Sequence, residues 1–177
     1  MSSAASFEDA VTALFNRQFG VLFRYINRLG GDPDLASDLA QEAFVKLYER
    51  GAMPDAPRAW LAAVATNLLR DAQRTAHRRE DLVVRDGSWT VVESPEALPD
   101  AVVASEETRA KVRSVLATLT PRDQQLLLLR HEGYSYRDLA TAVGVAEASV
   151  GTLLLRATRA FRDAYTRKSD GADATPE

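Results

Sequence analysis

The stretch that decides the fold is LTPRDQQLLLLRHEGYSYRDLATAVGVAEASVGTLLLRATRAFRDAY, which runs from Leu119 to Tyr165. Thr120 followed by a proline is a typical N-cap and first helical residue, so a helix is predicted from Thr120 to about Gly133. Ser135, with an aspartate three residues later, is a weaker capping box that predicts a second, short helix. Two helix starts so close together indicate a compact helical unit.

A glycine turn then leads into a third helix. Gly144 ends the short helix, and the new helix is predicted from about Glu147. Its inner face is expected to carry Val150 and either Leu153 or Leu154. This is the pattern of a helix-turn-helix, whose second helix enters a DNA major groove. A helical hairpin from any small bundle has the same spacing, and this alternative stays open. Basic residues that suit phosphates extend the last helix: Arg156, Arg159, Arg162, Arg167 and Lys168.

The composition limits the class of protein. The chain has 177 residues, 46% of them hydrophobic, which is enough for one domain or two small ones with real cores. It has no cysteine, and His77 and His131 alone cannot make a zinc site. No nucleophile–base set or phosphate loop is present, so neither an enzyme nor a cofactor is expected. The first residues lack a signal peptide's features and no later run reaches ~18 apolar residues, which predicts a cytoplasmic protein without membrane insertion.

The charge is distributed unevenly along the chain. A net charge of −3 argues by itself against a nucleic-acid binder. Nevertheless, arginines cluster at positions 70 to 79 and again in the 156–168 stripe, and a segment between them is rich in Asp and Glu. We predict a helical domain over 1–80, an acidic linker over 81–104, a helical domain over 105–168 and a disordered tail over 169–177. Short apolar patches around Trp89 can pack on a domain or dock on a partner.

The first 80 residues show the periodicity of three amphipathic helices. In the first helix, residues at helical spacing are expected to form a core: Phe7, Ala10, Val11, Leu14, Phe15, Leu22, Phe23, Ile26 and Leu29. Asp32 and Pro33 start the second helix, which ends near Gly51. Taken alone, its polar side chains are an ordinary solvated surface. The third helix follows a Pro-containing break and ends in a basic segment, where Arg70 and Arg74 share one face.

The order of these parts resembles a known family. A three-helix module with DLAQEAFVKLYE, a tryptophan helix AWLAAVATNLLRDAQRTAHRR, an acidic linker and a helix-turn-helix are similar to a bacterial sigma factor of the sigma-70 class. The small two-domain size resembles the extracytoplasmic-function (ECF) group. The resemblance covers Phe7 to about Tyr165. It implies an all-α fold of two small helical domains, a sigma2-like bundle and a sigma4-like helix-turn-helix, joined by an acidic, largely irregular linker.

The resemblance also implies partners and residues that bind them. The partners are core RNA polymerase, through its beta-prime and beta subunits, promoter DNA and an anti-sigma factor. In the family, the pattern of the second helix binds the coiled coil of the beta-prime subunit. The matching residues are Asp38, Gln41, Glu42, Phe44, Val45 and Lys46. The basic end of the third helix resembles the stretch that opens the promoter −10 element and captures flipped bases. We assign to it Asn67, Arg70, Asp71, Arg74 and Arg78.

The C-terminal match implies recognition of the −35 element, but here the sequence departs from the family's pattern. Apolar or small residues occupy positions where relatives often carry basic or polar ones, and Ala146 replaces the usual hydroxyl cap. The remaining candidate contacts are Ser149, Thr152, Arg156 and Arg159. Few direct contacts to base edges are therefore expected. Phosphate binding, shape readout or an accessory protein is expected to contribute more to recognition of the −35 element. Under one interpretation Leu155 is simply buried.

These features predict a non-catalytic promoter-specificity subunit. It would recruit core RNA polymerase, recognise promoter DNA with both domains and help to melt the −10 region. Two alternatives stay open at this point. One is a polymerase-independent DNA-binding regulator that uses the helix-turn-helix alone, and the other is a helical adaptor or anti-sigma-like protein with no DNA role.

Overall fold

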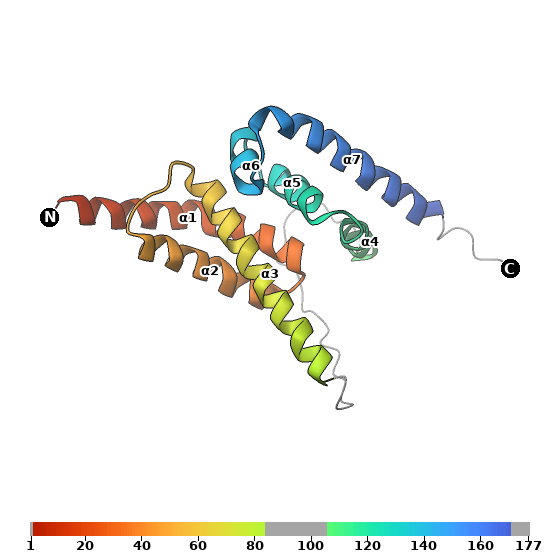
Figure 1. Ribbon diagram of the computed structural model, residues 1–177, viewed down its shortest axis with the longest axis horizontal. Coiled ribbons are helices and arrows are strands. Elements are labelled where there is room, and N and C mark those ends of the chain that lie inside the picture. Colours follow the sequence, from red (N-terminus) through yellow and green to blue (C-terminus); the bar gives the residue numbers. More distant parts are fainter. Residues whose placement is uncertain (1, 84–105, 171–177) are drawn as a thin grey trace. The chain divides into compact units, whose positions relative to one another are not determined.

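The computed structural model describes residues 2–83 and 106–170, and every regular element in these two ranges is an α-helix (Figure 1). The chain divides into two compact units, Met1–Glu96 and Ala97–Glu177. The predicted all-α class with two helical domains is thus confirmed. Most of the predicted acidic linker and of the predicted tail lies outside the described residues. The parts that are described, residues 81–83 and 169–170, are helical, which differs from the prediction.

The N-terminal unit contains three helices, α1 (Ser2–Gly30), α2 (Pro33–Arg50) and α3 (Pro57–Val83), each in contact with the other two. As predicted, Asp32 is the N-cap of α2, and its carboxylate accepts a hydrogen bond of 3.0 Å from the backbone N–H of Leu35. Gly51 ends this helix at a φ of 70°, a left-handed conformation that favours glycine. The third helix continues three residues past the predicted domain boundary at residue 80.

The core of this unit lies where the three helices meet, and it is formed by Leu22, Tyr25, Ile26, Leu39, Leu47, Leu61 and Leu69. A buried chain of hydrogen bonds joins two of the helices. The Thr66 hydroxyl donates to the carbonyl oxygen of Ala62 at 2.7 Å and accepts from the Tyr25 hydroxyl at 2.8 Å. A buried hydroxyl group without a hydrogen-bond partner costs free energy. These two hydrogen bonds therefore fix α1 against α3.

The expected core of α1 is correct for its central residues and wrong at one edge. Leu14, Leu22 and Ile26 are buried as predicted. Phe15, in contrast, is 37% exposed, and Ala10 is also exposed. Both lie beside the inner stripe of the helix, where the neighbouring helices cover only part of a side chain.

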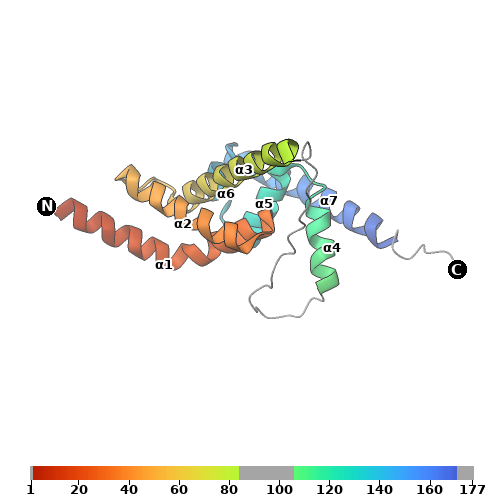
Figure 2. The same ribbon diagram turned by 90° about the horizontal axis from the view of Figure 1, so that it is seen from below.

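The C-terminal unit contains α4 (Glu106–Leu116), α5 (Pro121–His131), α6 (Tyr136–Val143) and α7 (Glu147–Asp170). The long helix α7 contacts each of the other three (Figures 1 and 2). Both predicted caps are confirmed. The Thr120 hydroxyl accepts a hydrogen bond of 3.2 Å from the N–H of Asp123, and Ser135 forms a complete capping box with Asp138. The core consists of Val115, Leu126, Leu129, Tyr134, Leu139 and Val150.

Within the described residues, no single helix has the length and apolar composition needed to cross a membrane. The helices α6 and α7 meet such a criterion only as a pair, with a bend of 87° between them.

Candidate functional surfaces

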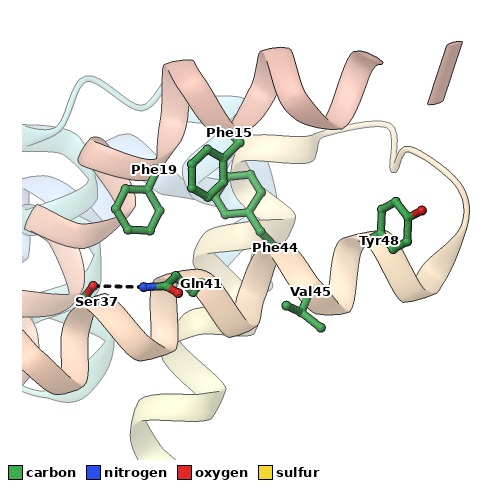
Figure 3. Close-up of a pocket in the computed structure, with 7 residues that line it drawn as sticks. All are labelled: Phe15, Phe19, Ser37, Gln41, Phe44, Val45 and Tyr48. Carbon is green, nitrogen blue, oxygen red and sulfur yellow. Dashed lines mark hydrogen bonds between the residues drawn. The ribbon is translucent and has the colours of Figure 1, made fainter. Parts of the chain in front are cut away.

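An open apolar groove of about 630 Å³ lies between α1 and α2 (Figure 3). Three aromatic rings form its floor. Phe15 stacks on Phe19 with ring centroids 4.8 Å apart, and it meets Phe44 edge-on at 5.0 Å. The complete lining is Phe15, Phe19, Ser37, Gln41, Phe44, Val45 and Tyr48. Single exposed hydrophobic side chains are common on protein surfaces, but clusters of them are not. An exposed apolar cluster of this kind therefore indicates a protein-interaction site.

The residues predicted to bind polymerase divide into two groups on α2. Gln41, Phe44 and Val45 line the groove. Phe44 is only 5% exposed and offers little more than a ring edge, whereas Val45 is 53% exposed and points away from α1 (Figure 3). The second group lies outside the groove lining and is exposed: Asp38, Glu42 and Lys46. The last two form a surface ion pair of 3.5 Å, which is worth little in stability and leaves both groups accessible.

Tyr48 extends this surface and was missed by the sequence prediction. Its side chain is 53% exposed, and its hydroxyl donates a hydrogen bond of 3.0 Å to the Glu8 carboxylate. That hydrogen bond and the nearby negative charge raise the pKa of Tyr48. The spacing of four residues between Phe15 and Phe19, and again between Phe44 and Tyr48, was the signal that could have located the groove.

The predicted −10 residues form one continuous stripe on the second half of α3. Their spacings of three and four residues place them on one helical face. Arg70 is half-buried and the others are exposed: Asn67, Asp71, Arg74 and Arg78. Arg74 lies 3.7 Å from the Asp71 carboxylate, and both side chains are largely solvated. The stripe begins at Asn67 and continues along the helix past Leu69, which is the last buried residue among the described side chains of α3.

The helix-turn-helix is formed by α6, a turn at Gly144 and α7. The bend of 87° between the two helices is close to the crossing typical of this motif, and Gly144 takes the left-handed φ of 70°. Buried Leu139 and Ala140 of α6 pack with the buried stripe of α7, which is Val150, Leu154 and Ala157. This geometry favours the helix-turn-helix over an ordinary helical hairpin, whose helices run antiparallel.

The outer face of α7 carries all four predicted −35 residues, which are Ser149, Thr152, Arg156 and Arg159, and each is exposed. The expectation that Leu153 or Leu154 faces inward is met by Leu154, which is 8% exposed. The interpretation that Leu155 is buried is wrong, because its side chain is 53% exposed. The inner stripe uses positions 150, 154 and 157, and residue 155 falls outside this helical spacing.

A long-range ion pair anchors one of these residues. The Asp123 carboxylate is buried at the start of α5, and it lies 3.4 Å from the guanidinium group of Arg156, which is 62% exposed. The negative charge of Asp123 also lies at the positive end of the α5 dipole. Arg156 is therefore held on the outer face of α7 by a residue 33 positions earlier in the sequence, with the remaining guanidinium N–H groups facing solvent.

Replacing Asp123 by asparagine is expected to destabilise the C-terminal unit by about 1–2 kcal/mol, because the favourable charge at the helix start and the ion pair are both lost. Urea unfolding of the full chain, followed by circular dichroism, measures this change. Arg122→Gln is the matched control, since Arg122 is exposed on the same turn. Equal stability of the Asp123 variant and the wild-type chain would show that this carboxylate does not anchor α7.

Comparison with known proteins gives the same division of the chain. Residues 14–79 match Sigma-70 region 2, and residues 109–161 match Sigma-70 region 4. The ECF RNA polymerase sigma factor SigL of Mycobacterium tuberculosis is 33% identical over 168 residues, which cover 92% of this chain and 93% of SigL. SigJ of the same organism is 34% identical over 142 residues, covering 75% of this chain and 44% of SigJ. The chain belongs to the ECF RNA polymerase sigma factors.

A solved structure shares the fold of this sigma factor. It is the sigma factor RpoE of Bartonella quintana, in complex with the anti-sigma factor NepR. The TM-score is 0.61 at 20% sequence identity, and the match covers 88% of this chain and 96% of that one. This similarity concerns the arrangement of the helices, because the sequences have diverged widely.

The two family matches contain every residue that the sequence analysis assigned to polymerase, to the −10 element or to the −35 element. The α2 surface and the α3 stripe lie within the region 2 match, and the outer face of α7 from Ser149 to Arg159 lies within the region 4 match. The assignment of individual residues to polymerase or DNA stays a prediction. In the described part of this sigma factor, no three His, Asp or Glu side chains gather closely enough to hold a metal ion.

Proposed function

We propose that this ECF sigma factor binds core RNA polymerase through α2 and the adjoining groove, contacts the −10 element with the α3 stripe and contacts the −35 element with the outer face of α7. It acts without catalysis of its own: it directs polymerase to promoters and helps to open the DNA. The observation that carries this proposal is the presence, in one chain, of a region 2 match and a region 4 match, in which every predicted contact residue except Phe44 is at least partly exposed.

The division of labour follows from the chemistry of the three surfaces. The groove is apolar with a few polar residues at its border, which suits a protein partner. The α3 stripe combines arginines with an amide and a carboxylate, and these groups can bind phosphates and the edges of unstacked bases. The outer face of α7 carries hydroxyl and guanidinium groups on a recognition helix, which suits a major groove.

Further proposals concern the partners and the place of action. The beta-prime and beta subunits are the proposed polymerase contacts, and the cytoplasm is the proposed compartment because polymerase and chromosome are there. An anti-sigma factor is proposed as a regulator of this chain, by analogy with the Bartonella protein, whose solved structure contains the anti-sigma factor NepR. The predicted division into domains belongs to the same set of proposals, with the boundaries at residues 80 and 168 moved to the ends of α3 and α7, at Val83 and Asp170.

Transcription with purified components tests the function. The chain is mixed with core RNA polymerase and a pool of genomic promoter fragments, and the transcripts are sequenced. We expect new start sites that require both proteins. Specific DNA binding by the chain without polymerase would instead favour the independent regulator. The helical adaptor would be favoured by two negative results together: no transcripts, and no cross-links from DNA to the α3 stripe or to the outer face of α7 in the polymerase complex.

A further inference from the structure

The C-terminal unit exposes an unexpected apolar side chain at the edge of its predicted DNA-binding face. Among its described residues, the large hydrophobic side chains with substantial exposure are Tyr136, at 43%, and Leu155, at 53%. Leu155 lies on the outer face of α7, three residues after Thr152 and four before Arg159. A leucine at this place adjoins two of the residues predicted to meet DNA, Thr152 and Arg159.

The neighbourhood of Leu155 leaves this side chain accessible. Gly151, one helical turn earlier, has no side chain, and a Cβ atom added there would meet the Tyr136 ring at 3.7 Å. That ring is itself in cation–π contact with Arg130, whose guanidinium carbon lies 5.5 Å from its centroid. Tyr136 thus packs beside the glycine, and the side chain of Leu155, one turn later, is 53% exposed.

The charges around Leu155 point to nucleic acid as the occupant of this face. Arg159 lies one helical turn after Leu155 and Arg156 follows it directly in the chain; both arginines are exposed, and the buried Asp123 anchors Arg156. An apolar patch of one leucine and one tyrosine is too small for the centre of a stable protein–protein interface. Exposed guanidinium groups beside one exposed apolar group match a DNA groove, where phosphates border the base edges.

We propose that Leu155 is a specificity-determining residue that contacts the 5-methyl group of a thymine in the −35 element. In the major groove, the apolar group that a base pair presents is the thymine methyl, while the other positions are hydrogen-bond donors or acceptors. A leucine cannot satisfy those polar groups, so it favours thymine and penalises the other bases at the same position. The proposal rests on the proposed function and names one contact within it.

The test uses the holoenzyme, reconstituted from the full chain and core polymerase. A promoter library randomised in the −35 region is first selected for binding, which identifies the preferred sequence. Each thymine of that sequence is then replaced in turn by deoxyuridine, which lacks only the 5-methyl group. At one or two positions we expect roughly fourfold weaker binding of the wild-type holoenzyme, the loss that corresponds to one buried methyl group.

The Leu155→Ala variant identifies the side chain that reads the methyl group. We expect it to bind thymine and deoxyuridine templates equally at that position, whereas Leu155→Met retains the preference. Thr158→Ala is the matched control, because Thr158 is exposed on the same helix but is not among the predicted contacts. In the reciprocal arm, 5-methylcytosine in place of cytosine at this position strengthens binding by the wild-type holoenzyme and not by Leu155→Ala.

Two results overturn the proposal. One is a Leu155→Ala holoenzyme that keeps the full preference for thymine, which would assign the methyl contact to another side chain. The other is a wild-type holoenzyme that selects a −35 sequence yet shows no preference for the methyl group at any position. A holoenzyme that selects no promoter sequence at all contradicts the proposed function itself, and the two failures are therefore distinguishable.

Discussion

Replacing Val45 by arginine is expected to weaken binding of this sigma factor to core RNA polymerase by about 100-fold or more. Val45 borders the apolar groove and is 53% exposed, so the variant should fold normally. A protein partner that covers the groove would have to bury the new guanidinium group without a counter-charge prepared for it. Binding is measured by fluorescence anisotropy of the labelled chain titrated with core polymerase, and folding by circular dichroism.

The matched control for this variant is Asn16→Arg. Asn16 is exposed on α1 but does not line the groove, so the same charge is added at a different surface of the same unit. This control is expected to bind polymerase within about twofold of the wild-type chain. If Val45→Arg binds as tightly as Asn16→Arg, polymerase does not cover the groove. The predicted contact would then be limited to the exposed polar residues of α2, which are Asp38, Glu42 and Lys46.

Reversing the charge of Arg70 and Arg74 together, by glutamate at both positions, is expected to reduce promoter opening by about 100-fold or more while polymerase binding is retained. Both residues lie in the α3 stripe, away from the groove lining. Glutamate at these positions repels the phosphates that arginine attracts. Opening is measured by permanganate reactivity of unpaired thymines around the −10 element.

The salt dependence of DNA binding gives this prediction a second readout. Loss of two phosphate contacts should lower the slope of log affinity against log salt concentration by roughly 2. The double variant Arg17→Glu and Arg24→Glu is the control, since both arginines are exposed on α1 outside the stripe. Loss of polymerase binding by the Arg70 and Arg74 variant would show instead that the stripe belongs to the polymerase surface.

The helices of this protein could be predicted from sequence because local chemistry determines their ends. Asp32, Thr120 and Ser135 accept hydrogen bonds from amides three residues later, and the glycine at 144 takes a conformation that other residues avoid. These interactions join neighbours in the chain, so the spacing of residue types reveals them. The family resemblance then supplied the order of the two domains.

The details of the candidate surfaces could not be predicted in the same way. Phe15 and Leu155 lie at the edges of apolar stripes. Burial of such a side chain depends on how much of the helix surface a neighbouring helix covers. The groove forms only when α1 and α2 pack at a suitable angle, and the pairing of Asp123 with Arg156 joins residues 33 positions apart. Periodicity describes one helix at a time, and these features arise between helices.

The exposed end of α3 has a consequence for how tightly this sigma factor can hold DNA. Beyond Leu69 the helix shows solvent-exposed side chains at most positions up to Arg78, so much of its regular conformation there depends on intrinsic helix propensity. Fraying of such an end costs little, and under the proposed function DNA binds well only to the fraction of molecules in which this end is helical. Exposed residues outside the predicted contacts, such as Gln73 and Ala76, are therefore expected to tune promoter strength through the local helix–coil equilibrium.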